Sequence, residues 1–216
     1  MEIDLVAHCG NSLQGDFINT LNTIDIKTTW TEKEAVMGKS QKRVFDGLTN
    51  IRERLPFDLL GIDSDGGSEF INFHLYNFCK TEKIVFTRSR PNKKNDAPHI
   101  EQKNYSVVRK VFGYSRFDTA QQLKLMNDLY RNELRLFQNF FQPTMKIIEK
   151  KRIGSKIVKK YNKAKTPFQR VLECSEVSGE RKRRLTKEYD LLDPIKLQHA
   201  IKKKIAKIIQ MAQRYS

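Results

Sequence analysis

A continuous apolar run at residues 57–62 places the tightest constraint on how this chain can fold. The run is interrupted only by Asp58. A strand of this composition has no polar face to turn toward water, so it fits a buried parallel strand that is covered on both sides. Parallel strands need long crossover connections, which are usually helices. The run therefore predicts an α/β fold.

The flanking segments extend this prediction. Residues 2–8 read as a short strand, and residues 16–27 alternate well enough for one strand or for two in a meander. Thr31 and Glu34 have the spacing of a helix capping box, which predicts an amphipathic helix that ends at Pro56. A helix over 68–80 and a short strand over 84–87 follow. We expect an α/β fold with a mixed sheet flanked by helices.

The pattern turns helical after residue 95, with helices predicted over 96–112 and 119–141. Residues 145–161 are predicted to form a basic β-hairpin, with a helix as the competing interpretation. Thr166-Pro167 and Asp193-Pro194 each combine an N-cap residue with a proline of the first helical turn, so helices are expected to finish the chain.

Charge divides the chain into two regions. Of the 216 residues, 41 are Lys or Arg and 25 are Asp or Glu, a formal charge of +16. Residues 1–142 hold 20 basic and 18 acidic residues (20 − 18 = +2), and residues 143–216 hold 21 and 7 (21 − 7 = +14). We expect a near-neutral domain at 1–142 and a basic C-terminal region at 143–216, which would bind DNA or mediate oligomerisation. A solvated charged surface is the simpler alternative.

Several classes of protein are excluded or disfavoured. No apolar run approaches the roughly 18 residues that a membrane helix needs, and the first residues lack the pattern of a signal peptide. The cysteines at 9, 79 and 174 are far apart and do not have zinc-site spacing, which predicts free thiols in a reducing compartment. We expect no membrane partner and a cytoplasmic location.

Acidic residues occupy three positions suited to chemistry. Glu2 and Asp4 share one face of the first strand, since side chains alternate along a strand. Asp63 and Asp65 lie where the buried strand ends, the usual place for catalytic groups in open sheets. Glu101 falls in an early turn of the helix predicted over 96–112, where an acid also favours the helix dipole. Each acid alone is more simply a surface charge.

The combination of Asp4, Asp65 and Glu101 resembles the D,D-35-E pattern of transposases and retroviral-type integrases, because 35 residues separate Asp65 from Glu101 (101 − 65 − 1 = 35). Three further segments resemble family motifs of the integrase core and of bacterial insertion-sequence transposases. They are Ser64-Asp65-Gly66-Gly67-Ser68-Glu69-Phe70, Thr87-Arg88-Ser89-Arg90-Pro91 and Lys94-Asn95-Asp96-Ala97-Pro98-His99-Ile100-Glu101. The resemblance covers about residues 2–141.

The resemblance implies a ribonuclease-H-like catalytic domain at 1–142 with Asp4, Asp65 and Glu101 as catalytic residues and metal ligands. Three neighbouring carboxylates repel one another by roughly 1–4 kcal/mol per pair at about 4 Å, and hard oxygen ligands select Mg²⁺ or Mn²⁺. Two such ions would support DNA strand cleavage by water and strand transfer by a 3′-hydroxyl. Asp63 and Glu2 are the weaker alternatives to Asp65 and Asp4.

Basic residues near the catalytic helix are expected to hold the DNA backbone, with a solvated loop and helix face as the alternative. They are Arg88, Arg90, Lys93, Lys94, Lys103, Arg109 and Lys110. Trp30, the single tryptophan, is expected in the core. The last helix has a stripe of apolar residues beside its basic ones, which predicts a docked or oligomerising helix.

Gly66 and Ala97-Pro98 depart from the family pattern, which leaves two rivals to a transposase: a metal nuclease that only hydrolyses, and a DNA-binding remnant without activity. Asp4 comes three residues after Met1, whereas related transposases carry an N-terminal helix-turn-helix region. We therefore expect a catalytic fragment, either a truncated copy or one reading frame of a split element with a separate helix-turn-helix partner. The family implies DNA ends and target DNA as partners, a homo-oligomer, and a bacterial, nucleoid-associated location.

Overall fold

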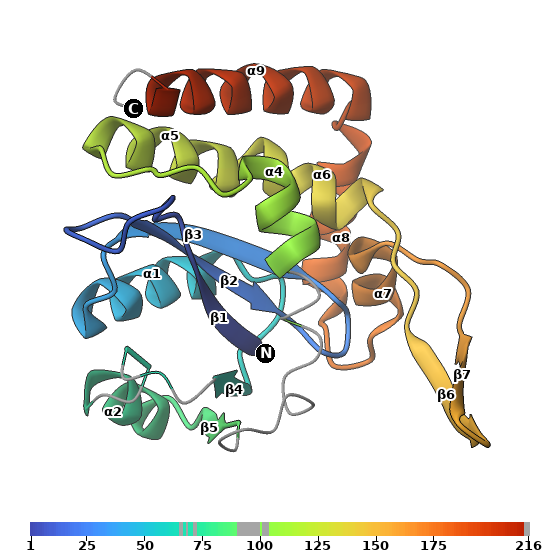
Figure 1. The fold of residues 1–216 in the computed structure, drawn as a ribbon. Helices are drawn as coiled ribbons and strands as arrows, with labels where there is room; N and C mark the ends of the chain where they lie inside the picture. The colour runs from blue at the N-terminus through green and yellow to red at the C-terminus, as the bar shows by residue number, and fades with distance from the viewer. Residues whose placement is uncertain (65–66, 68, 71–72, 90–99, 101–103, 214–216) are drawn as a thin grey trace.

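The computed structural model describes residues 1–64, 67, 69–70, 73–89, 100 and 104–213. Its centre is a five-stranded mixed sheet of order β3-β2-β1-β4-β5 (Figure 1). The strands are β1 (Glu2–Ala7), β2 (Ile18–Ile24), β3 (Thr31–Met37), β4 (Gly61–Ser64) and β5 (Val85–Arg88). Neighbours β1, β2 and β3 are antiparallel, whereas β4 is parallel to both β1 and β5. The predicted α/β class with a mixed sheet is confirmed.

Helices cover both faces of this sheet (Figure 1). One face packs on α1 (Gln41–Arg54), with α2 (Phe73–Thr81) beyond it, and the other face is covered by helices from the second half of the chain. These are η1 (Asn104–Arg109), α4 (Lys110–Phe112), α5 (Ala120–Arg131), α6 (Glu133–Phe141) and α9 (Pro194–Gln213). The chain also contains α7 (Pro167–Glu173), α8 (Gly179–Asp190) and a separate hairpin of β6 (Ile147–Ile153) and β7 (Lys156–Tyr161).

The C-terminal helices belong to the same cores as the sheet. Phe168 and Val171 of α7 lie in one hydrophobic cluster with the fully buried Trp30. Ile201 and Ile208 of α9 lie in the other, which includes Tyr130. The predictions of a core Trp30, of a docked last helix and of proline-started helices at Pro167 and Pro194 are confirmed. The domain boundary at residue 142 stays a prediction, and of the region that follows only the hairpin stands away from the sheet and helices (Figure 1).

Residues Thr31–Met37 were predicted to begin a helix, and that prediction is wrong: they form the edge strand β3. The reason lies in distant side chains. Asn139 of α6 accepts a hydrogen bond from the Thr31 amide at 2.9 Å and donates one to the Thr31 carbonyl at 2.8 Å. Asn127 of α5 does the same for Ala35, at 2.7 and 2.9 Å. These two asparagines satisfy the outward-facing backbone groups of Thr31 and Ala35, which an edge strand would leave open, and Arg54 donates to the Lys33 carbonyl between them at 2.9 Å.

Charged side chains complete the same edge. The carboxylates of Glu32 and Glu34 are buried, and both lie within 3.4 Å of the Arg54 guanidinium of α1. Arg135 pairs with Glu32 at 2.8 Å, and Arg131 pairs with Glu34. The capping-box spacing at Thr31 is therefore coincidental, since its glutamates are held by arginines from three helices.

The helix predicted over 119–141 is broken at Asn132, whose φ of −113° and ψ of −104° are not helical. In an unbroken helix, Asn127 and Asn139 would point about 120° apart, since each residue turns the helix by about 100°. The break allows both to reach β3. The strand predicted over 57–62 is displaced: β4 starts at Gly61 and contains only Gly61 and Ile62 of that run. The predicted hairpin is confirmed. The helices predicted over 68–80 and 96–112 lie partly outside the described residues; residues 73–80 of the first are in α2, and the described part of the second includes η1 and α4.

No helix in the described part of the chain is both long and apolar enough to cross a membrane. The three cysteines are free thiols, as predicted.

Replacing Asn139 by Ala is expected to lower the free energy of unfolding by about 2–5 kcal/mol, because two buried backbone groups lose their partners and each costs about 1–3 kcal/mol. Urea denaturation measures this change. Gln121→Ala on the exposed side of α5 is the control and should change it by less than about 0.5 kcal/mol. A loss for Asn139→Ala no larger than the control's would refute the edge-closing role.

His8 supplies a pH-dependent contribution to stability. Its Nε2 lies 2.8 Å from the Thr20 hydroxyl, which lies 2.6 Å from the Tyr130 hydroxyl, and burial lowers the pKa of His8 from 6.5 to about 3. Below pH 6.5, His8 binds a proton in the unfolded chain but stays neutral in the folded chain. The free energy of unfolding should therefore decrease as the pH is lowered from 6.5 to 5, by up to about 1.4 kcal/mol per pH unit. Urea denaturation of His8→Gln should lack this component, and an unchanged slope would exclude His8 as its source.

Candidate active site

Strand β1 carries the first predicted ligand in the middle of the sheet. Its residue Asp4 pairs with Asn22 of β2, and its residue Glu2 pairs with Asp63 of β4. Paired residues of neighbouring strands point to the same side of a sheet, so Asp4 shares its face with Asn22 and Glu2. This is the face that α5 and α6 cover.

Glu2, the alternative to Asp4, has a structural partner. Its side chain is 2% exposed, and Oε2 accepts a hydrogen bond from the Ile100 amide at 2.7 Å. The bond is charge-assisted and satisfies a backbone donor at the point where the chain becomes helical. Glu2 thus attaches the segment that precedes η1 to the central strand.

Asp4 is half-buried and bonded on both carboxylate oxygens. Oδ1 accepts a hydrogen bond from the Leu5 amide at 2.7 Å, and Oδ2 accepts one from Asn104 Nδ2 at 2.6 Å. Asn22 Nδ2 in turn donates to Asn104 Oδ1 at 2.8 Å. Asn104 therefore links the first strand and the second strand to η1.

The prediction from sequence did not include Asn104 or Asn22. A signal for Asn104 was present, because it follows Glu101 by three residues and positions three apart lie on one face of a helix. No sequence signal indicated Asn22, since its closeness to Asp4 depends on strand register. The Oδ1 atom of Asn22 is buried and has no hydrogen-bond partner within the described part of the chain.

Strand β4 leads toward the second predicted ligand. Its pairing with β1 ends at Ile3 and Ser64, and its pairing with β5 ends at Ser64 and Arg88. Asp65 follows Ser64 and lies outside the described residues. The alternative ligand, Asp63, accepts a hydrogen bond from the Thr87 hydroxyl at 2.7 Å, which is a partner on the neighbouring strand.

Glu101, the third predicted ligand, also lies outside the described residues, between two residues that contact β1. Ile100 bonds Glu2, and Asn104 bonds Asp4. The six residues from Asn104 form a π-helix, a rare conformation that often occurs at functional sites.

The predicted DNA-binding cations fall in different places. Arg88 is exposed at the carboxyl end of β5, beside Ser64. Arg109 lies at the other end of β1, where its charge contributes to the lowered pKa of His8, and its guanidinium is 4.8 Å from the Tyr114 ring centroid. Lys110 is exposed and stacks over Tyr105. Four further members of the predicted set, Arg90, Lys93, Lys94 and Lys103, lie outside the described residues.

The chemistry of the described donors fits a hard divalent cation. Asp4 offers two carboxylate oxygens, and a carboxylate oxygen that accepts one hydrogen bond can still coordinate a metal ion. Among the described residues, no group of three or more His, Cys, Asp or Glu side chains gathers to hold a metal ion, and two of the three predicted ligands are not in that set.

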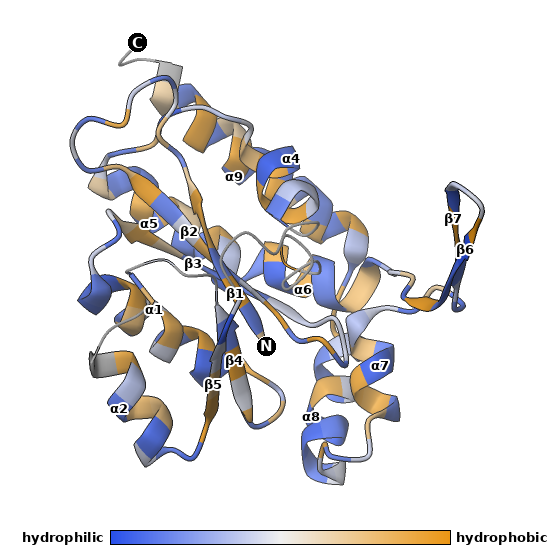
Figure 2. Ribbon diagram, turned by 60° about the horizontal axis from the view of Figure 1, so that its bottom comes forward, coloured by the Kyte–Doolittle hydropathy of each residue, from blue (hydrophilic) through white to orange (hydrophobic). Residues whose placement is uncertain are grey.

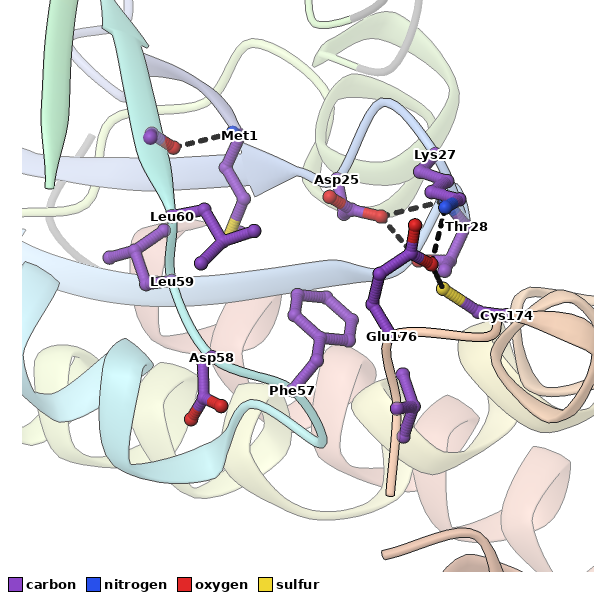
Figure 3. Close-up of a pocket in the computed structure, with 12 residues that line it drawn as sticks. Met1, Asp25, Lys27, Thr28, Phe57, Asp58, Leu59, Leu60, Cys174 and Glu176 are labelled. Carbon is purple, nitrogen blue, oxygen red and sulfur yellow. Dashed lines mark hydrogen bonds and ion pairs between the residues drawn. The ribbon is translucent and has the colours of Figure 1, made fainter. Parts of the chain in front are cut away.

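A cavity of about 280 Å³ lies at the opposite end of β4 (Figure 3). It is bordered by Met1, Phe57 and Leu60 on one side and by Cys174 and Glu176 on the other. Gly61 at the amino end of β4 lines it, whereas Asp4, Asn104 and Ser64 at the carboxyl end of β4 do not. The cavity is therefore separate from the candidate active site.

Comparison with solved structures shows the fold. The catalytic core domain of BIV integrase matches 80% of this chain and 92% of its own, with a TM-score of 0.51 and 14% identity. A simian T-cell lymphotropic virus intasome, in complex with a PP2A regulatory subunit, matches 78% of this chain and 52% of its own, with a TM-score of 0.51 and 12% identity. The chain has the ribonuclease-H-like fold of integrase cores.

Comparison of sequences finds a curated relative but no matching family model. The uncharacterized protein y4rM of Sinorhizobium fredii is 39% identical over 170 residues, which are 79% of this chain. The match covers 48% of that protein, so the chain spans about half the length of the curated relative that it matches. No protein-family model matches the chain.

Asn104→Ala is expected to lower the free energy of unfolding, measured without metal, by about 1.5–3 kcal/mol, because a hydrogen bond to a charged acceptor is lost. The control Asn11→Ala changes an exposed asparagine and should cost less than about 0.5 kcal/mol. Equal losses in the two variants would show that Asn104 does not anchor Asp4.

Proposed function

We propose that this protein cleaves DNA strands and transfers them, with Asp4, Asp65 and Glu101 holding divalent metal ions. The observation that carries the proposal is that sequence neighbours of Asp65 and Glu101 contact strand β1. Ser64, which precedes Asp65, pairs with Ile3, and Ile100 and Asn104, which flank Glu101, bond Glu2 and Asp4. The proposal is also supported by the fold, since integrase catalytic cores have the same one.

Strand register supports the pairing of Asp4 with Asp65. The parallel ladder of β1 and β4 ends at Ile3 and Ser64, and Asp4 and Asp65 are the next residues of the two chains. Since successive Cα atoms are about 3.8 Å apart, this register supports a site in which Asp4 and Asp65 act together. Asp63 is one step back in the ladder, opposite Glu2.

The contacts made by Ile100 and Asn104 support Glu101 as a ligand in the same way. Its neighbour Ile100 is bonded to Glu2, and Asn104, three residues later, is bonded to Asp4. These contacts support Glu101 as the third ligand, because both ends of the five-residue segment 100–104 bond the same strand.

Each residue has a distinct role in the proposed reaction. The three carboxylates would hold Mg²⁺ or Mn²⁺, which, when bound, would activate the attacking oxygen and stabilise the leaving one. Asn104 keeps the Asp4 carboxylate in a fixed orientation through its 2.6 Å bond. Arg88, exposed beside Ser64, would contact the DNA phosphate and so hold the scissile strand. Water attacks in cleavage, and a 3′-hydroxyl attacks in transfer.

The finer identity proposed is a D,D-35-E transposase of bacterial insertion-sequence type, based on the motifs after Ser64 and before Glu101. Its partners would be the element ends and target DNA, held by a homo-oligomer at the nucleoid, with a separate helix-turn-helix protein in a split element. The longer curated relative is compatible with further segments in such a system.

The test is an assay of labelled duplex DNA carrying the flanking inverted repeats, incubated with Mn²⁺. Asp4→Asn, Asp65→Asn and Glu101→Gln should each reduce product formation by about 100-fold or more, because each removes a charged group that the transition state needs. Calorimetric titration with Mn²⁺ should show weakened binding in the same variants.

Asp63→Asn is the matched control, since it removes a carboxylate two residues from Asp65 that is bonded to Thr87. It should retain activity within a few-fold. Equal products from the wild type and the three ligand variants would overturn the catalytic proposal, and nicks without joined strands would replace strand transfer by hydrolysis.

A further inference from the structure

The hairpin of β6 and β7 projects from the rest of the molecule in both ribbon views (Figures 1 and 2). Every residue of both strands is exposed. The hairpin is attached at its base, where Thr144 pairs with Lys165 and the Asn162 amide donates to the Lys146 carbonyl at 2.9 Å. The ammonium of Lys146 adds a bond of 2.8 Å to the Ile26 carbonyl. The projecting part is therefore a free two-stranded ribbon on a fixed base.

A ribbon of this kind gains little stability from burial, because two strands alone are marginally stable in water. Its apolar side chains remain open to solvent: Ile148, Ile153, Ile157 and Val158 are each more than half exposed. Nothing in the core requires the hairpin, so its composition reflects what it meets outside the chain.

Cross-strand register separates the hairpin into two faces. Residues that pair directly share a face. The mixed face contains Glu149, Lys151, Ile153, Lys156, Val158 and Lys160, and the cationic face contains Lys150, Arg152, Ile157 and Lys159. On the mixed face, Lys151 forms an ion pair with Glu149 at 3.1 Å. The cationic face has no acidic residue.

On the cationic face, Lys150 stands directly opposite Lys159. Like charges in directly opposed positions destabilise a sheet. Arg152, on the same face, donates from Nε to the Gly154 carbonyl at 3.3 Å, which shapes the turn and leaves its charge uncompensated. Within the part of the chain that the structure describes, none of these three cations forms an ion pair. An external polyanion would relieve their repulsion.

We propose that the cationic face of this hairpin is a docking surface for duplex DNA, and that the hairpin enters the major groove with Lys150, Arg152 and Lys159 against the phosphates. The seven residues of β6 span about 23 Å at about 3.3 Å per residue. The major groove of B-DNA, about 12 Å wide, admits a two-stranded ribbon. Ile157, on the same face, would contact base edges or thymine methyl groups.

Duplex DNA is favoured over duplex RNA because the major groove of A-form RNA is deep and too narrow for side chains to enter. The inference deepens the proposed function by assigning a second DNA contact to it, but binding can be measured without chemistry. Deleting residues 143–216 is unsuitable as a test, since α7 and α9 contribute to the cores.

The experiment compares two triple variants of the full chain. Lys150→Gln/Arg152→Gln/Lys159→Gln neutralises the cationic face, and Lys151→Gln/Lys156→Gln/Lys160→Gln removes the same charge from the mixed face. Fluorescence anisotropy with a 30-base-pair duplex is recorded in EDTA over about 50–200 mM salt. Because every side chain changed is exposed, thermal melting should be the same in the two variants and the wild type.

Neutralising the cationic face should reduce the magnitude of the negative slope of log affinity against log salt by about 2–3, since each phosphate contact contributes about −0.9. The mixed-face variant should reduce this magnitude by less than about 1. Equal decreases in both variants, no decrease, or binding to duplex RNA or anionic vesicles as tight as to DNA would overturn the assignment. The anisotropy is recorded in EDTA and needs no catalysis, so failure of the docking assignment and failure of the catalytic proposal remain distinguishable.

Discussion

Two carboxylates on one central strand organise the rest of the candidate site. Glu2 and Asp4 lie on the same face of β1, and burying a carboxylate is costly unless it is hydrogen-bonded. Their partners, the Ile100 amide and the Asn104 side chain, belong to a segment about one hundred residues later in the chain. Satisfying these acids therefore brings the helical segment against the sheet, and the proposed chemistry depends on this contact.

The edge of the sheet formed by β3 is closed by side chains instead of another strand. Asn127 and Asn139 each bond both backbone groups of one β3 residue, as a neighbouring strand would. The break at Asn132 aims both asparagines at this edge, and arginines hold the two buried glutamates between them. As a result α5 and α6 are fixed over the face that carries Asp4. The apolar side of α9 covers these helices, which explains why much of the basic C-terminal region is structural.

The local sequence pattern predicted some secondary-structure elements correctly and others wrongly. Apolar runs and alternation predicted β1, β4 and the hairpin, and proline signals predicted the starts of α7 and α9. The capping-box spacing at Thr31 failed, because the residues that make this segment a strand come from three helices distant in sequence. Asp4 was predicted on the correct strand, whereas Asn22 was missed, since its closeness to Asp4 follows from the pairing of β1 with β2.

The sequence by itself determined the fold class, the central strand that bears Asp4, and the order of acids along the chain, because each depends on local residue type and spacing. Only the tertiary structure decided that Ile3 and Ser64 end the same ladder, that Asn104 bonds Asp4, and that one face of the hairpin carries cations and no acid. These facts depend on register between segments, and register is set by the packing of the whole chain rather than by any one segment.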